Sequence, residues 1–269
     1  MQVKILWCML WLTLVCQIAV ANSAEEKEWG TLRGQFIYQG DAPKRARLRP
    51  YRRVEQFVAS PLLDSSLLVN EKNHGIANVV IWLYRRPKDE PISPIHSSYD
   101  KSAEAAVKVT STLRSFEPHI VLLRTSQKLE LVNGDTEGHN FKIDPLMNEA
   151  FNILVPAGGH FSKGLSFEKR EHIPFHMDSS LYPWIRGFVF VQDHPYFTLT
   201  DSNGNFKIEN LPVGTWKFRT WHERSGYLRD VVRGMKKETW KRGEIELTIK
   251  PGDNNLREIF IPPDFFKTT

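Results

Sequence analysis

Residues 173–191, which read IPFHMDSSLYPWIRGFVFV, constrain the fold of this chain more than any other stretch. We expect a strand that leads into a loop, a turn of the chain at Pro183–Trp184, and a second, apolar strand at Gly187–Val191 after the loop. Short strands separated by turn residues recur from His119 onward, and few segments have the period of a helix. The pattern therefore predicts an all-β fold, an antiparallel sandwich or barrel.

Two segments before His119 also have strand character. Ile76–Tyr84 is a short, β-branched and nearly continuous apolar run, which indicates a buried strand. Leu32–Tyr38 alternates imperfectly, with Arg33 and Gln35 on the face opposite Leu32. Arg85–Glu117 is rich in proline and polar residues, so we expect a long connection there, with a helical turn or two at Ser102–Val109.

The first 21 residues have the three parts of a secretory signal peptide. Lys4 supplies the positive region, Ile5–Val15 the apolar region, and Ala19–Ala21 a small-x-small cleavage site. We therefore expect cleavage and a periplasmic or secreted protein without a membrane span. The alternatives are a membrane anchor, for which Ile5–Ala21 is at the short limit of a span, and a lipoprotein attached through Cys16, which is disfavoured because a large residue precedes it.

Both cysteines of the chain, Cys8 and Cys16, lie in this leader. We therefore expect the mature protein to contain no disulfide, no thiolate nucleophile and no thiolate metal ligand. A chain of 269 residues can bury enough apolar surface to fold without a disulfide.

The charge balance is mildly basic. The formal net charge is +5, and subtracting the single lysine of the leader leaves +4, which does not indicate a nucleic-acid partner. A basic run at Lys44–Arg53 has two readings. It is either a patch for an anionic glycan, a lipid headgroup or an acidic partner, or a solvated loop. The second reading is favoured, because neither interleaved aromatic residues nor a known fold supports nucleic-acid binding there.

Several motifs resemble the cupredoxin family, in particular the exported methylamine-utilisation-type cupredoxins. Phe116–Val121, Leu129–Asp135 and Gly138–Asn140 resemble the family's approach to its first copper histidine. Val155–Gly159 resembles the turn that follows, and Tyr182–Phe188 resembles the family's His-Pro-Trp-Met-x-Gly-Tyr ending. Gly30–Leu83 resembles the N-terminal part of such proteins. The resemblance implies a cupredoxin-like Greek-key sandwich over residues 25–192.

The remaining part of the chain resembles a different family. Thr200–Phe206, read TDSNGNF, and Leu211–Gly214, read LPVG, resemble the carboxypeptidase-regulatory-like, carbohydrate-binding-like domain. The resemblance implies a small prealbumin-like β-sandwich over residues 195–265, with a boundary near Gln192–Pro195.

The copper site implied by the first resemblance is degenerate in this chain. His139 falls on the first histidine, but Ser179 stands where the cysteine is expected, Tyr182 where the second histidine is expected, and Ile185 where the axial methionine is expected. A hydroxyl and a phenol are poor substitutes for a thiolate and an imidazole, and isoleucine has no donor atom. We therefore expect no copper cofactor and no blue-copper electron transfer.

Two other groups of residues could still form a site. His172, His176 and Asp178 could join His139 in a metal site of another kind, or be ordinary polar residues. Trp221, with His222 and Glu223 after it, could stack on a sugar or close a core, and the core is favoured.

These observations favour an exported, non-enzymatic binding or interaction protein, because no nucleophile elbow or other catalytic motif is present. Its partner is expected to be an envelope polysaccharide or another exported protein. The alternatives are a metal-binding or electron-transfer protein with a histidine-based copper site, and a glycan-binding accessory protein.

Overall fold

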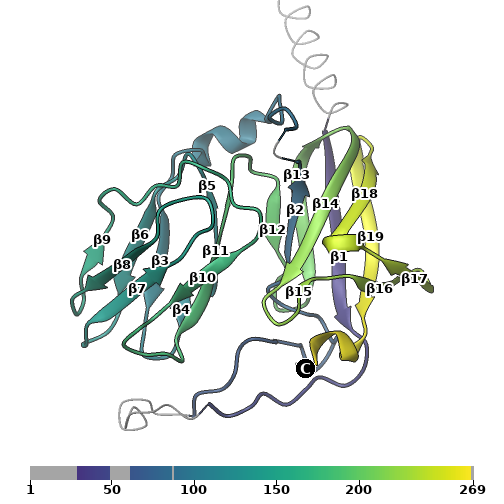
Figure 1. Cartoon of the computed structure of the whole chain (residues 1–269). Coiled ribbons are helices and arrows are strands. Elements are labelled where there is room, and N and C mark those ends of the chain that lie inside the picture. Colours follow the sequence, from purple (N-terminus) through teal and green to yellow (C-terminus); the bar gives the residue numbers. More distant parts are fainter. Residues whose placement is uncertain (1–28, 49–60, 87, 268–269) are drawn as a thin grey trace, which may run out of the picture.

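The computed structural model describes residues 29–48, 61–86 and 88–267, and it is built almost entirely of strands (Figure 1). The predicted all-β class is therefore confirmed. The predicted leader, with Cys8 and Cys16, and the end of the basic run from Arg49 onward lie outside the described residues. Within the described ranges, no helix combines the length and the apolar character needed to cross a membrane.

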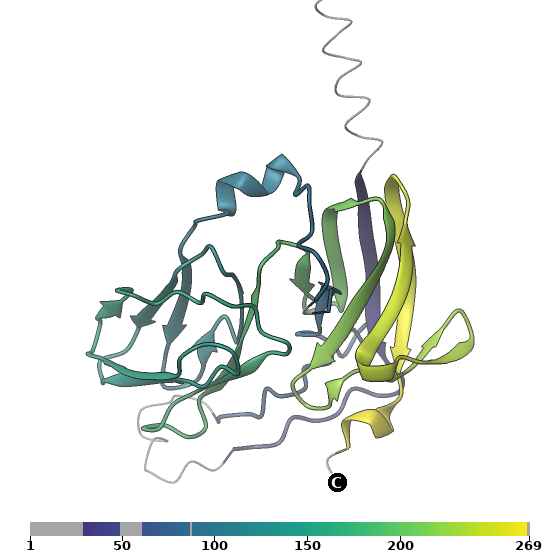
Figure 2. The ribbon, with the colours of Figure 1, turned by 45° about the horizontal axis from the view of Figure 1, so that its top comes forward.

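The strands form two sandwiches that lie side by side in both views (Figures 1 and 2). The terminal sandwich, named because it contains the first and last strands, has one sheet in the order β13-β1-β19-β16-β17 and another in the order β12-β2-β14-β15, with β18 pairing with β14. Its elements are β1 (Trp29–Tyr38), β2 (Val80–Tyr84), β12 (Phe197–Leu199), β13 (Asn205–Pro212), β14 (Gly214–His222), β15 (Gly226–Tyr227), β16 (Asp230–Arg233), β17 (Lys236–Thr239), β18 (Glu244–Ile249), β19 (Gly252–Ile261) and the short 3₁₀ helices η3 (Lys241–Gly243) and η4 (Pro263–Phe266).

The central sandwich is built from residues 107–192. One sheet has the order β5-β11-β10-β7-β8 and the other has the order β4-β3-β6-β9. Its strands are β3 (Val107–Ser111), β4 (Phe116–Glu117), β5 (Ile120–Arg124), β6 (Leu129–Asn133), β7 (His139–Ile143), β8 (Phe151–Val155), β9 (His160–Phe161), β10 (Phe175–Asp178) and β11 (Arg186–Gln192), and the 3₁₀ helix η2 (Ser97–Ser102) precedes them.

The strand pairing differs from the predicted division at residues 192–195. Strand β1 pairs with β13 and β19, and β2 pairs with β12 and β14, so both belong to the terminal sandwich and not with residues 107–192. Leu32 and Phe36 of β1 are buried in one core with Phe206 and Ile208 of β13. The chain therefore begins in one sandwich, builds the other, and returns.

Parallel pairs are the second difference from the predicted antiparallel sandwich. Strand β1 runs parallel to β19, β3 to β6, and β5 to β11. Strand β3 also replaces the helical turns expected at Ser102–Val109, since the 3₁₀ helix ends at Ser102 and extended backbone begins at Val107. Val109 is fully buried in the central core, so tertiary packing determines the conformation of this segment.

A shared apolar layer, the seam, joins the two sandwiches. It contains Val80 and Trp82 of β2 and Phe188 and Phe190 of β11, while the alternate residues of each strand face the core of their own sandwich. The Trp82 and Phe190 rings pack edge to face with centroids 4.8 Å apart. Both strands are therefore buried on two faces, which explains why their sequences are continuous apolar runs.

Candidate functional site

The four copper-like positions come together at one end of the central sandwich. His139 begins β7, Ser179 and Tyr182 lie in the turn between β10 and β11, and Ile185 directly precedes β11. The imidazole of His139 and the phenol ring of Tyr182 are 4.7 Å apart between ring centroids. His139 and Ile185 are fully buried and Ser179 is nearly so.

Hydrogen bonds within the chain close the turn. The Ser179 hydroxyl donates to Oδ1 of Asn140 at 2.9 Å and accepts from the backbone N–H of Tyr182 at 3.1 Å. The backbone N–H of Leu181 donates to the same Asn140 oxygen at 3.1 Å. Ser179 therefore acts as a structural hydroxyl that organises the turn.

The donor set does not fit a type 1 copper site. His139 supplies one imidazole, whose Nε2 lies 3.0 Å from Oδ2 of Asp135. Its buried Nδ1 has no hydrogen-bond partner among the described residues. Burial lowers the pKa of His139, and the Asp135 carboxylate partly offsets this effect. A hydroxyl, a phenol and an alkyl side chain complete the set, so the soft sulfur ligands that such a centre requires are missing.

The other predicted metal ligands are not brought together. Strand alternation places His139 on the core face of its sheet, whereas His176 and Asp178 lie on the opposite face from the buried Met177. The His176 ring packs against Phe188, with centroids 4.7 Å apart. Across residues 29–48, 61–86 and 88–267, no three His, Cys, Asp or Glu side chains are arranged to hold a metal ion, so His172 does not complete a site either.

The Trp221 group belongs to the interior. Trp221 is part of the seam and is 4% exposed, so its ring is not available to stack on a sugar. His222 is also buried, and Glu223 pairs with His119 of the central sandwich at 2.6 Å. The reading of this segment as part of a core is therefore the correct one.

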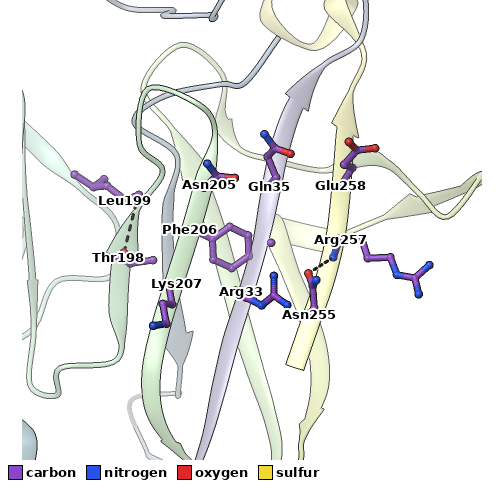
Figure 3. A pocket seen from close by; sticks show the side chains of 11 residues that line it. Arg33, Gln35, Thr198, Leu199, Asn205, Phe206, Lys207, Asn255, Arg257 and Glu258 are labelled. Carbon is purple, nitrogen blue, oxygen red and sulfur yellow. Dashed lines mark hydrogen bonds between the residues drawn. The ribbon is translucent and has the colours of Figure 1, made fainter. Parts of the chain in front are cut away.

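An open polar pocket lies on the terminal sandwich, on the outer face of β13, β1 and β19 (Figure 3). It is a pocket of about 700 Å³. The alternation of β1 predicts that Arg33 and Gln35 share one strand face, but it does not predict the pocket, because the other walls come from strands more than 160 residues away in the chain. The residues that line it are Arg33, Gly34, Gln35, Thr198, Leu199, Asn205, Phe206, Lys207, Asn255, Arg257 and Glu258.

Strand register arranges the polar side chains of this pocket in two rows. Arg33 lies directly opposite Lys207 on one side and Asn255 on the other. Gln35 lies opposite Asn205 and Glu258 in the same way. The first row therefore carries two cations and an amide, and the second carries two amides and a carboxylate.

Both cations of the first row also have an acidic neighbour. The Arg33 guanidinium binds Asp253 through two parallel hydrogen bonds of 2.6 and 2.7 Å, and Lys207 pairs with Glu209. The hydrogen bonds from Arg33 lower the pKa of Asp253, so this carboxylate remains ionised. The side chains of Arg33 and Lys207 are each about half exposed, and both remain accessible from the pocket.

A β-bulge shapes the middle of the pocket. Leu256 and Arg257 together oppose Gly34, and Arg257 adopts a left-handed backbone with a φ of 59°. A Cβ atom on Gly34 would lie 2.8 Å from the Phe206 ring and 3.2 Å from the Arg257 carbonyl oxygen. Glycine is therefore required at position 34, and the close approach of these strands depends on it.

Comparisons with known proteins identify similar structures but no family. No protein-family model matches the chain, and no curated protein sequence matches it. A reduced Cu(I) form of an amicyanin mutant is 18% identical over 32% of this chain and 82% of its own, with a TM-score of 0.29. A purple cupredoxin from Nitrosopumilus maritimus is 17% identical over 32% of this chain and 99% of its own, with a TM-score of 0.27. A copper-containing nitrite reductase from Thermus scotoductus is 17% identical over 40% of this chain and 25% of its own, with a TM-score of 0.29.

Proposed function

We propose that this chain is an exported, non-enzymatic binding protein whose ligand is a glycan held in the pocket on β13, β1 and β19. The observation that carries the proposal is the two rows of polar side chains that line an open pocket of about 700 Å³. Hydroxyl-rich ligands are recognised by a small number of placed amides, carboxylates and cations in a concave site.

Three amide atoms support this proposal because their hydrogen-bonding capacity is unused. Gln35 and Asn205 each donate through their side-chain nitrogen, to Asn203 and Asp201 respectively, and Asn255 accepts from the backbone of Arg257. The other amide atoms, Oε1 of Gln35, Oδ1 of Asn205 and Nδ2 of Asn255, have no partner within the described part of the chain. Two acceptors and one donor are thus available for sugar hydroxyls.

The side chains at the copper-like positions of the central sandwich support the non-enzymatic part of this proposal. Ser179 is engaged by Asn140 and Tyr182, and Ile185 offers no donor atom. We propose that this cupredoxin-like sandwich serves as a rigid support joined to the binding sandwich through the seam, and that electron transfer is not its role.

Polysaccharide binding of the purified mature chain tests this function. We expect retention of the protein on an immobilised envelope polysaccharide and a measurable heat of binding with its oligosaccharides. Gln35→Ala and Asn205→Ala should each weaken the affinity by about tenfold, since each removes a hydrogen bond from a site that has few alternatives.

A matched variant keeps this experiment specific. Gln39→Ala removes an exposed amide from the same segment of chain outside this pocket, and it should leave the affinity unchanged. The proposed function is wrong if no polysaccharide is bound, or if the pocket variants bind as well as the parent protein.

A further inference from the structure

The pocket lacks the usual means of holding a neutral sugar. Of its lining residues, only Phe206 is aromatic, and that ring is 4% exposed. Neutral saccharides and nucleobases both gain affinity by stacking on exposed aromatic rings. A ligand of this pocket must therefore be recognised through hydrogen bonds and charge.

Two cations of the pocket lie side by side on neighbouring strands. Arg33 and Lys207 are direct cross-strand partners on one face, an arrangement that is destabilising by itself. Asp253 pairs with Arg33 and also attracts Lys207, and Glu209 pairs with Lys207, so the two acids offset part of this repulsion. An anion that bridges Arg33 and Lys207 would relieve their repulsion.

Donor capacity remains for such an anion. A guanidinium carries five N–H donors, and Arg33 uses two of them on Asp253. Figure 3 shows Arg33 and Asn255 next to each other on neighbouring strands, with Lys207 on the other side of β1. Arg257 also lines the pocket, but its side chain extends away from β1 in the same view.

The second row makes the two ends of the pocket chemically different. Glu258 lies one row away from Arg33, beside Gln35, and would repel an anion while accepting hydrogen bonds from hydroxyls. An anionic group therefore fits the end formed by Arg33 and Lys207, and the hydroxyl-bearing part fits the end formed by Gln35, Asn205 and Glu258.

From this geometry we infer that the pocket selects acidic polysaccharides, in which a sugar carboxylate lies between Arg33 and Lys207 while neighbouring hydroxyls contact the amides of the second row. This inference rests on the proposed function, since it names the chemical class of the glycan. It assigns Arg33 and Lys207 as the residues that distinguish acidic from neutral chains.

Isothermal titration with two forms of one polymer tests the inference. Oligosaccharides of polygalacturonate carry a carboxylate on each sugar, and their methyl esters keep the backbone while losing the charge. The mature full chain should bind the free acid about tenfold more tightly than the ester, and the difference should shrink as salt is raised, because the added ions screen exposed charges.

Substitutions that are expected to change the affinity in opposite directions give a specific test. Arg33→Gln and Lys207→Gln should each weaken binding of the acid by about tenfold, whereas Asp253→Asn should strengthen it, because it removes the acid that competes for Arg33. A loss of folding would weaken binding in every variant and could not strengthen it in Asp253→Asn. Arg186→Gln, an exposed cation on the central sandwich with a side chain 68% exposed, is the matched control and should change nothing.

The possible results separate this inference from the function on which it rests. Equal binding of acid and ester overturns the inference and leaves glycan binding in place. If the protein binds neither polymer and is not retained on any envelope polysaccharide, both the inference and the proposed function are overturned. Tighter binding of a single-stranded oligonucleotide through the same two cations also overturns the inference, since it would assign the pocket to another polymer.

Discussion

The Ser179 hydroxyl donates a 2.9 Å hydrogen bond to the side-chain oxygen of Asn140. The same hydroxyl accepts from the backbone of Tyr182. The turn between β10 and β11 is thus held by hydrogen bonds between residues of the chain itself.

Ser179→Ala should lower the free energy of unfolding by about 1–2 kcal/mol, because it removes the hydroxyl that accepts from the Tyr182 N–H and one of the two donors to the Asn140 oxygen. Urea unfolding followed by fluorescence measures the change. Ser162→Ala, at an exposed position without such bonds, should stay within about 0.5 kcal/mol of the parent. Equal stability of the two variants would show that the Ser179 bonds are not structural.

The combined variant Ser179→Cys, Tyr182→His and Ile185→Met should bind Cu(II) with an intense visible charge-transfer band. It would supply a thiolate, a second imidazole and a thioether near the buried, unpartnered Nδ1 of His139. Absorption spectroscopy and metal analysis provide the measurement. Adding His139→Ala to the same variant should abolish the band. A folded triple variant without this band would show that the four positions do not surround one point.

Stability should fall as the pH is lowered, because of two buried histidines. Burial lowers the pKa of His222 to about 3 and that of His194 to about 4, from an ordinary value of 6.5. Below pH 6.5 the unfolded chain therefore binds protons that the folded chain does not. Each histidine should contribute full stability above pH 6.5 and lose about 1.4 kcal/mol per pH unit on acidification, until its folded pKa is reached.

The test compares unfolding free energies at pH 7 and pH 5. His222→Gln should reduce the difference between the two pH values, even if it lowers stability at both. His160→Gln, at an exposed position, should leave the difference unchanged. An unchanged difference in His222→Gln would show that this histidine takes up its proton equally in both states.

Trp82→Ala should weaken the seam more than either core. Trp82 is 1% exposed and packs between Phe190 and Tyr227, so its removal should cost about 3–5 kcal/mol. Because the seam joins the sandwiches, we expect calorimetric unfolding to separate into two transitions. Met235→Ala, at a side chain 98% exposed, is the control and should change stability by less than about 0.5 kcal/mol. A single transition with unchanged stability would contradict a joining role for the seam.

Local patterns in the chain predicted many of the strands but not their partners. The apolar runs at β2 and β11 were recognised because continuous burial needs continuous apolar residues. Helical turns were expected at Ser102–Val109, but β3 begins at Val107, where Val107, Val109 and Thr110 favour a strand and β6 pairs with it in parallel. The predicted boundary at residues 192–195 likewise missed that β1 pairs with β19, because strand pairing over more than 200 residues leaves no local mark.

The sequence by itself determined the β class and the absence of a soft-ligand set at His139, Ser179, Tyr182 and Ile185, because period-two alternation and donor chemistry are properties of single residues and their neighbours. Only the tertiary structure decided that Arg33 faces Lys207 across the β1–β13 pair and that Trp221 is buried in the seam. Those placements depend on register between distant strands and on which sheet faces meet. No stretch of the chain encodes them alone.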